Sequence, residues 1–142
     1  MTVHFDIAQI DRVQAAPTPL QARRDAGKRA DFAGRSAEQA VTVQFDRLGY
    51  DLVDLRWRGQ AGEIDLIFQG ADTYVFVEVK QARTHDQAIA RLRPAQMQRI
   101  HAAASEYLAY TPDGQLSSVR FDLATVDSTG DIQIIENAFG HF

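Results

Sequence analysis

Hydrophobic and polar positions alternate along two short segments in the middle of the chain. Residues 62–68 read Gly-Glu-Ile-Asp-Leu-Ile-Phe, and residues 74–80 read Tyr-Val-Phe-Val-Glu-Val-Lys. Both are rich in the β-branched and aromatic side chains that favour strands. The Gly-Ala-Asp-Thr of residues 70–73 between them is typical of a turn. The pattern therefore predicts a β-hairpin.

This hairpin brings acidic side chains opposite each other. A turn centred on residues 71 and 72 pairs Gln69 with Tyr74, Ile67 with Phe76, Asp65 with Glu78 and Glu63 with Lys80, all on one face of the sheet. Facing like charges destabilise a sheet, and a carboxylate buried without a partner costs several kcal/mol as an order of magnitude. A divalent cation such as Mg²⁺ would remove both penalties. The alternative is a solvated polar face with Glu63–Lys80 as a surface ion pair worth about 0–1 kcal/mol.

A helix is predicted before the hairpin, from Ser36 to Leu48. Ser36 and Gln39 fit a capping box, and Gly49 is a natural stop. The apolar stripe consists of Ala37, Val41, Phe45 and Leu48. Glu38 lies in the first turn at the edge of that stripe, where a carboxylate also stabilises the helix N-terminus.

The other segments complete an α/β pattern. Residues 50–57 predict a strand before the hairpin, and residues 84–92 a loop or short helix. Pro94 is a favourable first residue for a helix that extends to about Tyr110. Strands follow at residues 119–126 and 132–135. This order predicts an α/β sandwich with a mixed five-stranded sheet and helices on both faces. Residues 1–20 show no sustained period and are expected to be a variable extension, with one domain over residues 21–142.

Composition narrows the class of protein. The 142 residues are 45% apolar and 24% charged, which is ordinary for a soluble globular protein. No apolar run approaches the roughly 18 residues that span a bilayer, and the N-terminus lacks a signal core. The absence of cysteine excludes disulfides and thiolate zinc sites. We therefore expect a cytoplasmic protein with no membrane partner. His85 and His101 lack zinc spacing and are expected to be ordinary surface or packing residues.

The net charge of −4 argues against a large non-specific nucleic-acid surface. Local basic clusters remain, and each could equally be solvated surface charge. The clusters are Arg23, Arg24, Lys28, Arg29 and Arg35 ahead of the first helix, and Arg83, Arg91, Arg93 and Arg99 after the hairpin. We expect Arg35, Arg83, Arg93 and Arg99 to contact nucleic acid.

The acids of the hairpin also form a known type of motif. Asp65, twelve intervening residues and then Glu78-Val79-Lys80 have the form of the acid…acid-x-Lys signature of restriction-endonuclease-like nucleases. In that chemistry the middle residue, here Val79, lends its backbone carbonyl to the metal. Over residues 34–139 the chain resembles the YraN-like family of small bacterial proteins, which is grouped with endonucleases and Holliday-junction-resolvase-like folds. The segments that carry the resemblance are Gly-Arg-Ser-Ala-Glu at 34–38, Gly-Glu-Ile-Asp-Leu-Ile at 62–67, Val-Phe-Val-Glu-Val-Lys at 75–80, Arg-Phe-Asp at 120–122 and Asn-Ala-Phe at 137–139.

The resemblance implies a restriction-endonuclease-like α/β/α core in which Glu38, Asp65 and Glu78 are the acids and Lys80 the catalytic lysine. Two segments depart from the family pattern. Gln81-Ala82-Arg83 follows the lysine where a hydroxyl or aromatic residue and then Arg are usual, and the second long helix opens with Gln96-Met97-Gln98-Arg99 where a Lys-Gln pair is usual. The second departure removes a basic residue that could contact phosphate, although Arg93 or Arg99 could substitute.

The sequence therefore predicts a metal-dependent endonuclease acting on DNA, more than on RNA, with branched or structured DNA as the expected substrate. In this hypothesis Asp65 and Glu78 hold Mg²⁺ or Mn²⁺, Glu38 is an outer or third ligand, and Lys80 helps to generate the attacking hydroxide. Glu63 is either the partner of Lys80 or orients the site. Symmetric cutting of both strands would require a homodimer. The alternative is a non-catalytic nucleic-acid-binding or protein-interaction module of the same fold, which the net charge and the missing helix lysine favour.

Overall fold

The structure is a computed structural model that describes residues 34–140, which fall within one compact unit of residues 33–142. The predicted extension of residues 1–20 and its boundary with the domain lie outside the described residues. The same holds for four of the predicted basic residues, Arg23, Arg24, Lys28 and Arg29.

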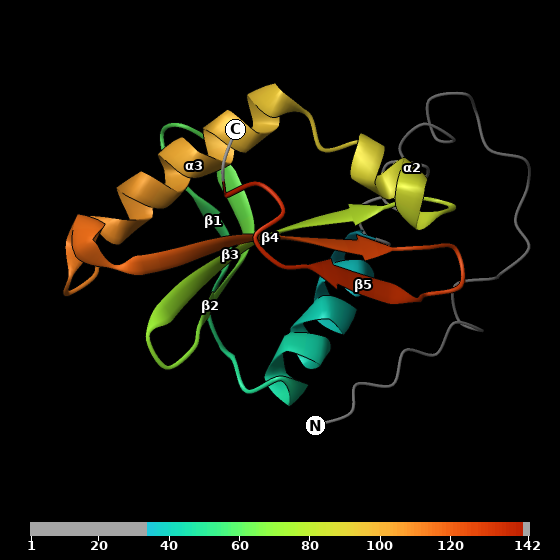
Figure 1. The fold of residues 1–142 in the computed structure, drawn as a ribbon, viewed down its shortest axis with the longest axis horizontal. Coiled ribbons are helices and arrows are strands. Elements are labelled where there is room, and N and C mark those ends of the chain that lie inside the picture. The colour runs from blue at the N-terminus through green and yellow to red at the C-terminus, as the bar shows by residue number, and fades with distance from the viewer. Residues whose placement is uncertain (1–33, 141–142) are drawn as a thin grey trace, which may run out of the picture. The chain divides into compact units, whose positions relative to one another are not determined.

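One mixed sheet forms the centre of the fold (Figure 1). Its strands are β1 (Asp51–Arg58), β2 (Glu63–Gln69), β3 (Thr73–Gln81), β4 (Ser118–Val126) and β5 (Ile132–Ile135), in the spatial order β1-β2-β3-β4-β5. The parallel pair is β3 and β4, and the other neighbours are antiparallel. A parallel pair needs a crossover. Here the crossover contains α2 (His85–Ala90), α3 (Pro94–Leu108) and the short 3₁₀ turn Gly114–Leu116.

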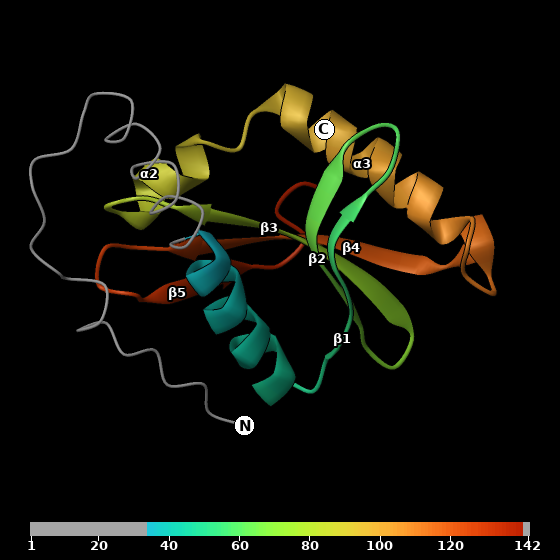
Figure 2. The same ribbon diagram turned by 180° about the vertical axis from the view of Figure 1, so that it is seen from behind.

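The helix of residues 34–47 packs against one face of the sheet and α3 against the other (Figures 1 and 2). Alternate strand residues supply the two cores, because side chains of a strand point to opposite faces. Leu66, Phe68, Val75 and Val77 join Ala37, Val41 and Phe45 in one core, whereas Ile67, Phe76 and Phe121 join Ile100, Ala103, Ala104 and Leu108 in the other. The fold is therefore the predicted α/β/α sandwich.

The helix ends differ from the predictions. The first helix already includes residue 34, so Ser36 lies inside it and does not cap it. Leu48 is 56% exposed and does not continue the apolar stripe. The helix stops at residue 47 because Gly49 adopts a left-handed φ of 92°, and the next ring, Tyr50, then packs edge-on against Phe45. Helix α3 ends at Leu108, two residues before Tyr110, which is 84% exposed.

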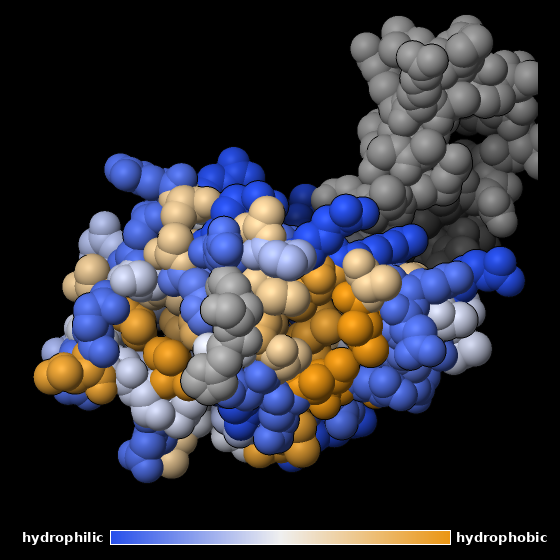
Figure 3. All heavy atoms as spheres, turned by 45° about the horizontal axis from the view of Figure 1, so that its top comes forward, coloured by the Kyte–Doolittle hydropathy of each residue, from blue (hydrophilic) through white to orange (hydrophobic). Residues whose placement is uncertain are grey.

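Some large hydrophobic side chains remain exposed. Five of them lie on or just after the first helix and on β1, namely Val43, Leu48, Leu52, Val53 and Leu55. Hydrophobic residues gather in the middle of the face shown in Figure 3, with hydrophilic side chains around them. Isolated exposed apolar residues are normal, but the group on β1 lies along the edge strand of the sheet.

Across residues 34–140, every helix is too short or too polar to cross a membrane.

Candidate functional site

Strands β2 and β3 stop pairing where the acids begin. The ladder contains the predicted Gln69–Tyr74 and Ile67–Phe76 pairs and ends at Leu66–Val77. Beyond it, the carboxylate Oδ2 of Asp65 accepts a hydrogen bond from the backbone N–H of Val79 at 2.8 Å. The side chain thus replaces the missing strand partner for this N–H group. The two strands diverge here, and the divergence makes room for polar side chains.

Four side chains meet at this opening. The carboxyl groups of Asp65 and Glu78 lie close enough for the charge of Asp65 to raise the pKa of Glu78. Lys80 lies two residues beyond Glu78 on the same face, with its Nζ 3.2 Å from Oε1 of Glu78. From α3, Gln96 Nε2 donates a hydrogen bond of 2.8 Å to the same oxygen. Glu78 is only 5% exposed, and its Oε1 has two protein partners, Lys80 and Gln96.

Burial controls the charge of the acid pair. It raises the pKa of Glu78 to about 8, the negative charge of Asp65 adds to the rise, and Lys80 opposes it. Burial also raises the pKa of Asp65, and the hydrogen bond from Val79 opposes that rise. At neutral pH, in the absence of a cation, the pair is therefore expected to retain a proton.

Glu38 reaches the same region from the first helix. It is 9% exposed, and its Oε2 accepts a hydrogen bond of 2.9 Å from Nε of Arg56 on β1. Burial raises the pKa of Glu38, the bond to Arg56 lowers it, and the charge of Asp65 raises it. Glu38, Asp65 and Glu78 do not bring three ligand atoms within 4.8 Å of one another. A role of Glu38 as an outer or third ligand therefore stays a prediction.

Arg56 is a site residue that the sequence pattern does not predict. It has a φ of 49°, a left-handed conformation that is uncommon for a non-glycine residue and costs of order 1–3 kcal/mol. It lies between the Leu55–Leu66 and Trp57–Ile64 pairs of the β1–β2 ladder, opposite Asp65. Gln96 is a second such residue, and it lies in the segment of residues 96–99 that departs from the family pattern. The sequence contains no local signal for either contact.

The predicted site residues are only partly brought together. Glu38, Asp65, Glu78 and Lys80 converge, but the predicted pairing of Glu63 with Lys80 is wrong. Glu63 lies beyond the end of the β2–β3 ladder and forms an exposed ion pair of 3.0 Å with Arg58. Val79 contributes its N–H group to Asp65, and a metal contact through its carbonyl stays a prediction. The four arginines predicted to contact nucleic acid, Arg35, Arg83, Arg93 and Arg99, are all exposed.

A separate polar cluster lies at the turn between β4 and β5. His85 Nε2 is 2.9 Å from Oδ2 of Asp131 and 3.6 Å from Oδ2 of Asp127, and His85 Nδ1 is 2.7 Å from Oγ1 of Thr125. Within residues 34–140, His85, Asp127 and Asp131 are the group with three potential metal-ligand atoms inside 4.8 Å. Their mutual contacts join the start of α2 to this turn. The sequence did not indicate the cluster because His85 is about 40 residues from both acids.

The raised pKa of Glu78 predicts that alkaline pH destabilises the metal-free protein. A carboxyl group with a raised pKa in the folded state stabilises it fully below its unfolded value of 4.5, and this stability is lost as the pH rises toward about 8. Glu78→Gln mimics the protonated group. In EDTA it should unfold like wild type near pH 5 and be more stable by about 1–3 kcal/mol at pH 8.5.

Urea unfolding at both pH values measures this difference. Asp72→Asn is the matched control, because it neutralises an exposed acid in the turn of the same hairpin. It should give a small and pH-independent change. Equal stability of wild type and Glu78→Gln at pH 8.5 would show that Glu78 is not a strained carboxylate.

The family model and the similar proteins found by comparison all name the same family. The sequence model of the family described as "Uncharacterised protein family UPF0102" matches residues 37–126, a range that contains Glu38, Asp65, Glu78 and Lys80. A UPF0102 protein of Ruegeria pomeroyi is 52% identical over 86% of this chain and 99% of its own length. One of Cereibacter sphaeroides is 50% identical over 80% of this chain and 97% of its own, and one of Dinoroseobacter shibae is 40% identical over 84% and 90%.

Proposed function

This chain belongs to the UPF0102 family, and we propose that it is a metal-dependent endonuclease that hydrolyses phosphodiester bonds in DNA. The membership agrees with the YraN-like resemblance predicted from the motifs. The observation that carries the proposal is the close approach of the partly buried carboxyl group of Asp65 to the buried one of Glu78, with the ammonium of Lys80 3.2 Å from Glu78.

The residues present fit a hard divalent cation. Asp65 and Glu78 offer oxygen ligands from adjacent strands, and Mg²⁺ and Mn²⁺ prefer such ligands. Burial raises the pKa of Glu78 to about 8, so the pair is electrostatically unfavourable when both groups are ionised. A bound cation would relieve this repulsion and take the place of the shared proton. Asp65 and Glu78 would hold the ion directly, and Glu38 would be an outer or third ligand.

The chain's own residues then have separate tasks. When bound, the cation would supply Lewis-acid stabilisation of the charge that develops on the phosphate. Lys80 would donate a hydrogen bond to a phosphate oxygen or to the attacking water, because its ammonium is already held on the face of the acids. Gln96 keeps Oε1 of Glu78 in place from α3. The Glu38–Arg56 ion pair holds a guanidinium beside the acids, where it would attract the DNA backbone.

One observation favours the alternative of a non-catalytic nucleic-acid-binding or protein-interaction module. Oε1 of Glu78 already has two donors, Lys80 and Gln96, so the polar groups are satisfied without a cation. In that case the acid pair and its lysine form a buried network whose role is structural. Metal binding separates the two functions.

Metal titration should stabilise the wild-type protein if the site binds a cation. Mn²⁺ or Mg²⁺ at about 100 times its dissociation constant should add roughly 2.7 kcal/mol, which raises the melting temperature by several degrees. The shift should be larger at pH 8 than at pH 6, because a proton on Glu78 competes with the ion. Thermal unfolding after EDTA treatment measures it.

Two variants show where the cation binds. The double variant Asp65→Asn with Glu78→Gln should lose the shift. His85→Ala should retain it, because the His85 cluster is the other group of potential ligands in the described part of the chain. If the shift disappears only in His85→Ala, the cation binds at the His85 cluster and not at the acid pair. That result would contradict the proposed chemistry and support the non-catalytic alternative.

A further inference from the structure

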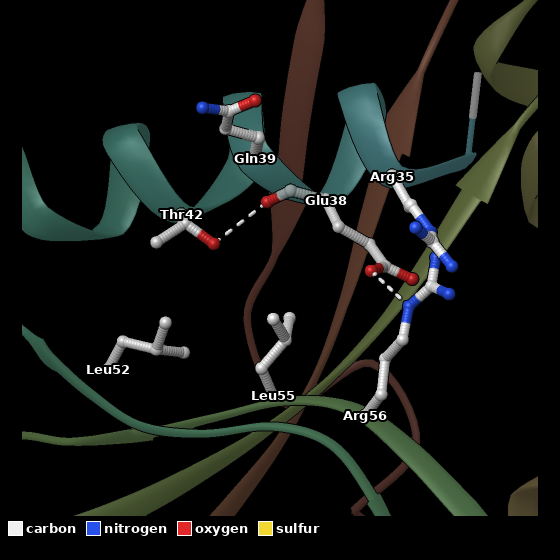
Figure 4. A pocket seen from close by; sticks show the side chains of 7 residues that line it. All are labelled: Arg35, Glu38, Gln39, Thr42, Leu52, Leu55 and Arg56. Carbon is white, nitrogen blue, oxygen red and sulfur yellow. Dashed lines mark hydrogen bonds and ion pairs between the residues drawn. The ribbon is translucent and has the colours of Figure 1, made fainter. Parts of the chain in front are cut away.

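A pocket of about 450 Å³ lies between the first helix and β1, directly beside the candidate site (Figure 4). Leu52 and Leu55 project into it from β1, and Thr42 and Glu38 project from the helix. Arg35, Gln39 and Arg56 complete its lining. The pocket therefore shares one residue, Glu38, with the acids proposed to act on DNA.

The two ends of the pocket differ in chemistry. Leu52 and Leu55 are 41% and 54% exposed and form an apolar wall that is open to solvent. At the other end the side chains of Arg35 and Arg56 point toward one another beside Glu38 (Figure 4). The planar guanidinium groups of these two arginines are donors whose geometry matches a phosphate group. A ligand that fits both ends has an apolar part attached to an anion.

The size of the pocket selects among such ligands. Pockets of roughly 300–1,000 Å³ hold small molecules, so one nucleoside fits within 450 Å³. A paired base cannot enter, because it is held in the duplex stack. An unpaired base can leave the stack at the lowest cost, and that difference makes a base pocket selective for unpaired positions.

We propose that this pocket binds one unpaired nucleotide next to the phosphate that is cleaved, with the base against Leu52 and Leu55 and its phosphate at Arg35 and Arg56. The proposal rests on the proposed nuclease function and narrows its substrate to DNA that carries a single-stranded branch or flap. Fully paired DNA, including the arms of a four-way junction, lacks this anchor and binds through its backbone alone.

Binding is tested with Asp65→Asn protein in Ca²⁺, so that no probe is cut. The probes are a fluorescein-labelled duplex, the same duplex with a short single-stranded flap, and that flap with an abasic site at its first unpaired position. The intact flap should bind about tenfold more tightly than the abasic flap, because only the intact flap buries a base against the leucines.

Variants on β1 assign the effect to the pocket. Leu55→Asp places a negative charge in the apolar wall and should reduce binding of the intact flap to the abasic level, with duplex binding unchanged. Val53→Asp is the matched control, since Val53 is 39% exposed on the same strand and does not line the pocket. It should leave all three affinities unchanged. Leu52→Asn repeats the test on the same wall should Leu55→Asp prove unfolded by circular dichroism.

The outcomes separate this inference from the proposed function. Equal affinity for intact and abasic flaps would overturn the nucleotide pocket. So would an equal loss of affinity for all three probes in Leu55→Asp. In that case, Asp65-dependent cleavage of duplex DNA in Mn²⁺ would leave the nuclease proposal standing. If wild-type protein neither binds nor cuts any probe, both proposals fail.

Discussion

Replacing Asp65 by Asn should lower metal-dependent DNA cleavage by about 10³-fold or more. The carboxylate is one of two that would hold the cation, and losing the cation removes several kcal/mol of charge stabilisation in the transition state. The fold should persist, because an amide oxygen can still accept the hydrogen bond from Val79. Single-turnover cleavage of a labelled flap substrate in Mn²⁺, with protein free of contaminating nuclease, measures the effect.

Stability distinguishes a catalytic role of Asp65 from a structural one. The metal-free variant should melt at or above the wild-type temperature, because the substitution removes repulsion between apposed acids. Asp72→Asn controls for the loss of one negative charge in the same hairpin and should keep cleavage within about threefold of wild type, because Asp72 is exposed in the turn. If Asp65→Asn and Glu78→Gln both melt far below wild type in EDTA, the acids are structural and the proposal is wrong.

Lys80→Ala is expected to lower the cleavage rate by about 10²–10⁴-fold, the range for a positioned acid–base group. DNA binding in Ca²⁺ should change only slightly, because Lys80 is mostly buried beside Glu78. It therefore contributes little to the protein surface that would contact the DNA backbone. The pH optimum of the cleavage rate should also move to higher pH. Lys80 lowers the pKa of Glu78, so its removal makes this carboxyl group harder to ionise and to metallate.

The comparison of rate and affinity tests this role. A parallel loss of binding and cleavage would make Lys80 a backbone contact with no separate role in the reaction. An unchanged rate would remove Lys80 from the mechanism. Arg83→Ala is a suitable control, since it removes an exposed cation three residues along the chain and should affect the salt dependence of binding more than the rate.

Much of the fold follows from the sequence because the strands obey a simple alternation. Ile67 and Phe76 pair as predicted and enter the core under α3, while Leu66 and Val77 enter the opposite core. The same rule fails at Glu63, since it assumes that the two strands remain paired. They separate after Leu66, and Asp65 and Glu78 meet through their side chains without any ladder at that point.

Other parts of the site depend on tertiary contacts that no local pattern encodes. Gln96 touches Glu78 only because α3 crosses the sheet with its first turn above this carboxyl group. Arg56 reaches Glu38 from a strand position that periodicity marks as ordinary, through a backbone conformation that favours glycine. The chemistry of the acids could be predicted from residue types and spacing. The groups that hold them in place could not.

The hydrogen bond from Val79 to Asp65 has a consequence for how the family can diverge. Asp65 serves the backbone of β3 as well as the proposed chemistry, so a descendant that lost catalysis would still need an acceptor at this position. Selection for folding alone would then preserve Asp or Asn at residue 65 and release Glu78 and Lys80. Among related chains, a drift at these last two positions with residue 65 retained would mark the proteins that have given up the reaction.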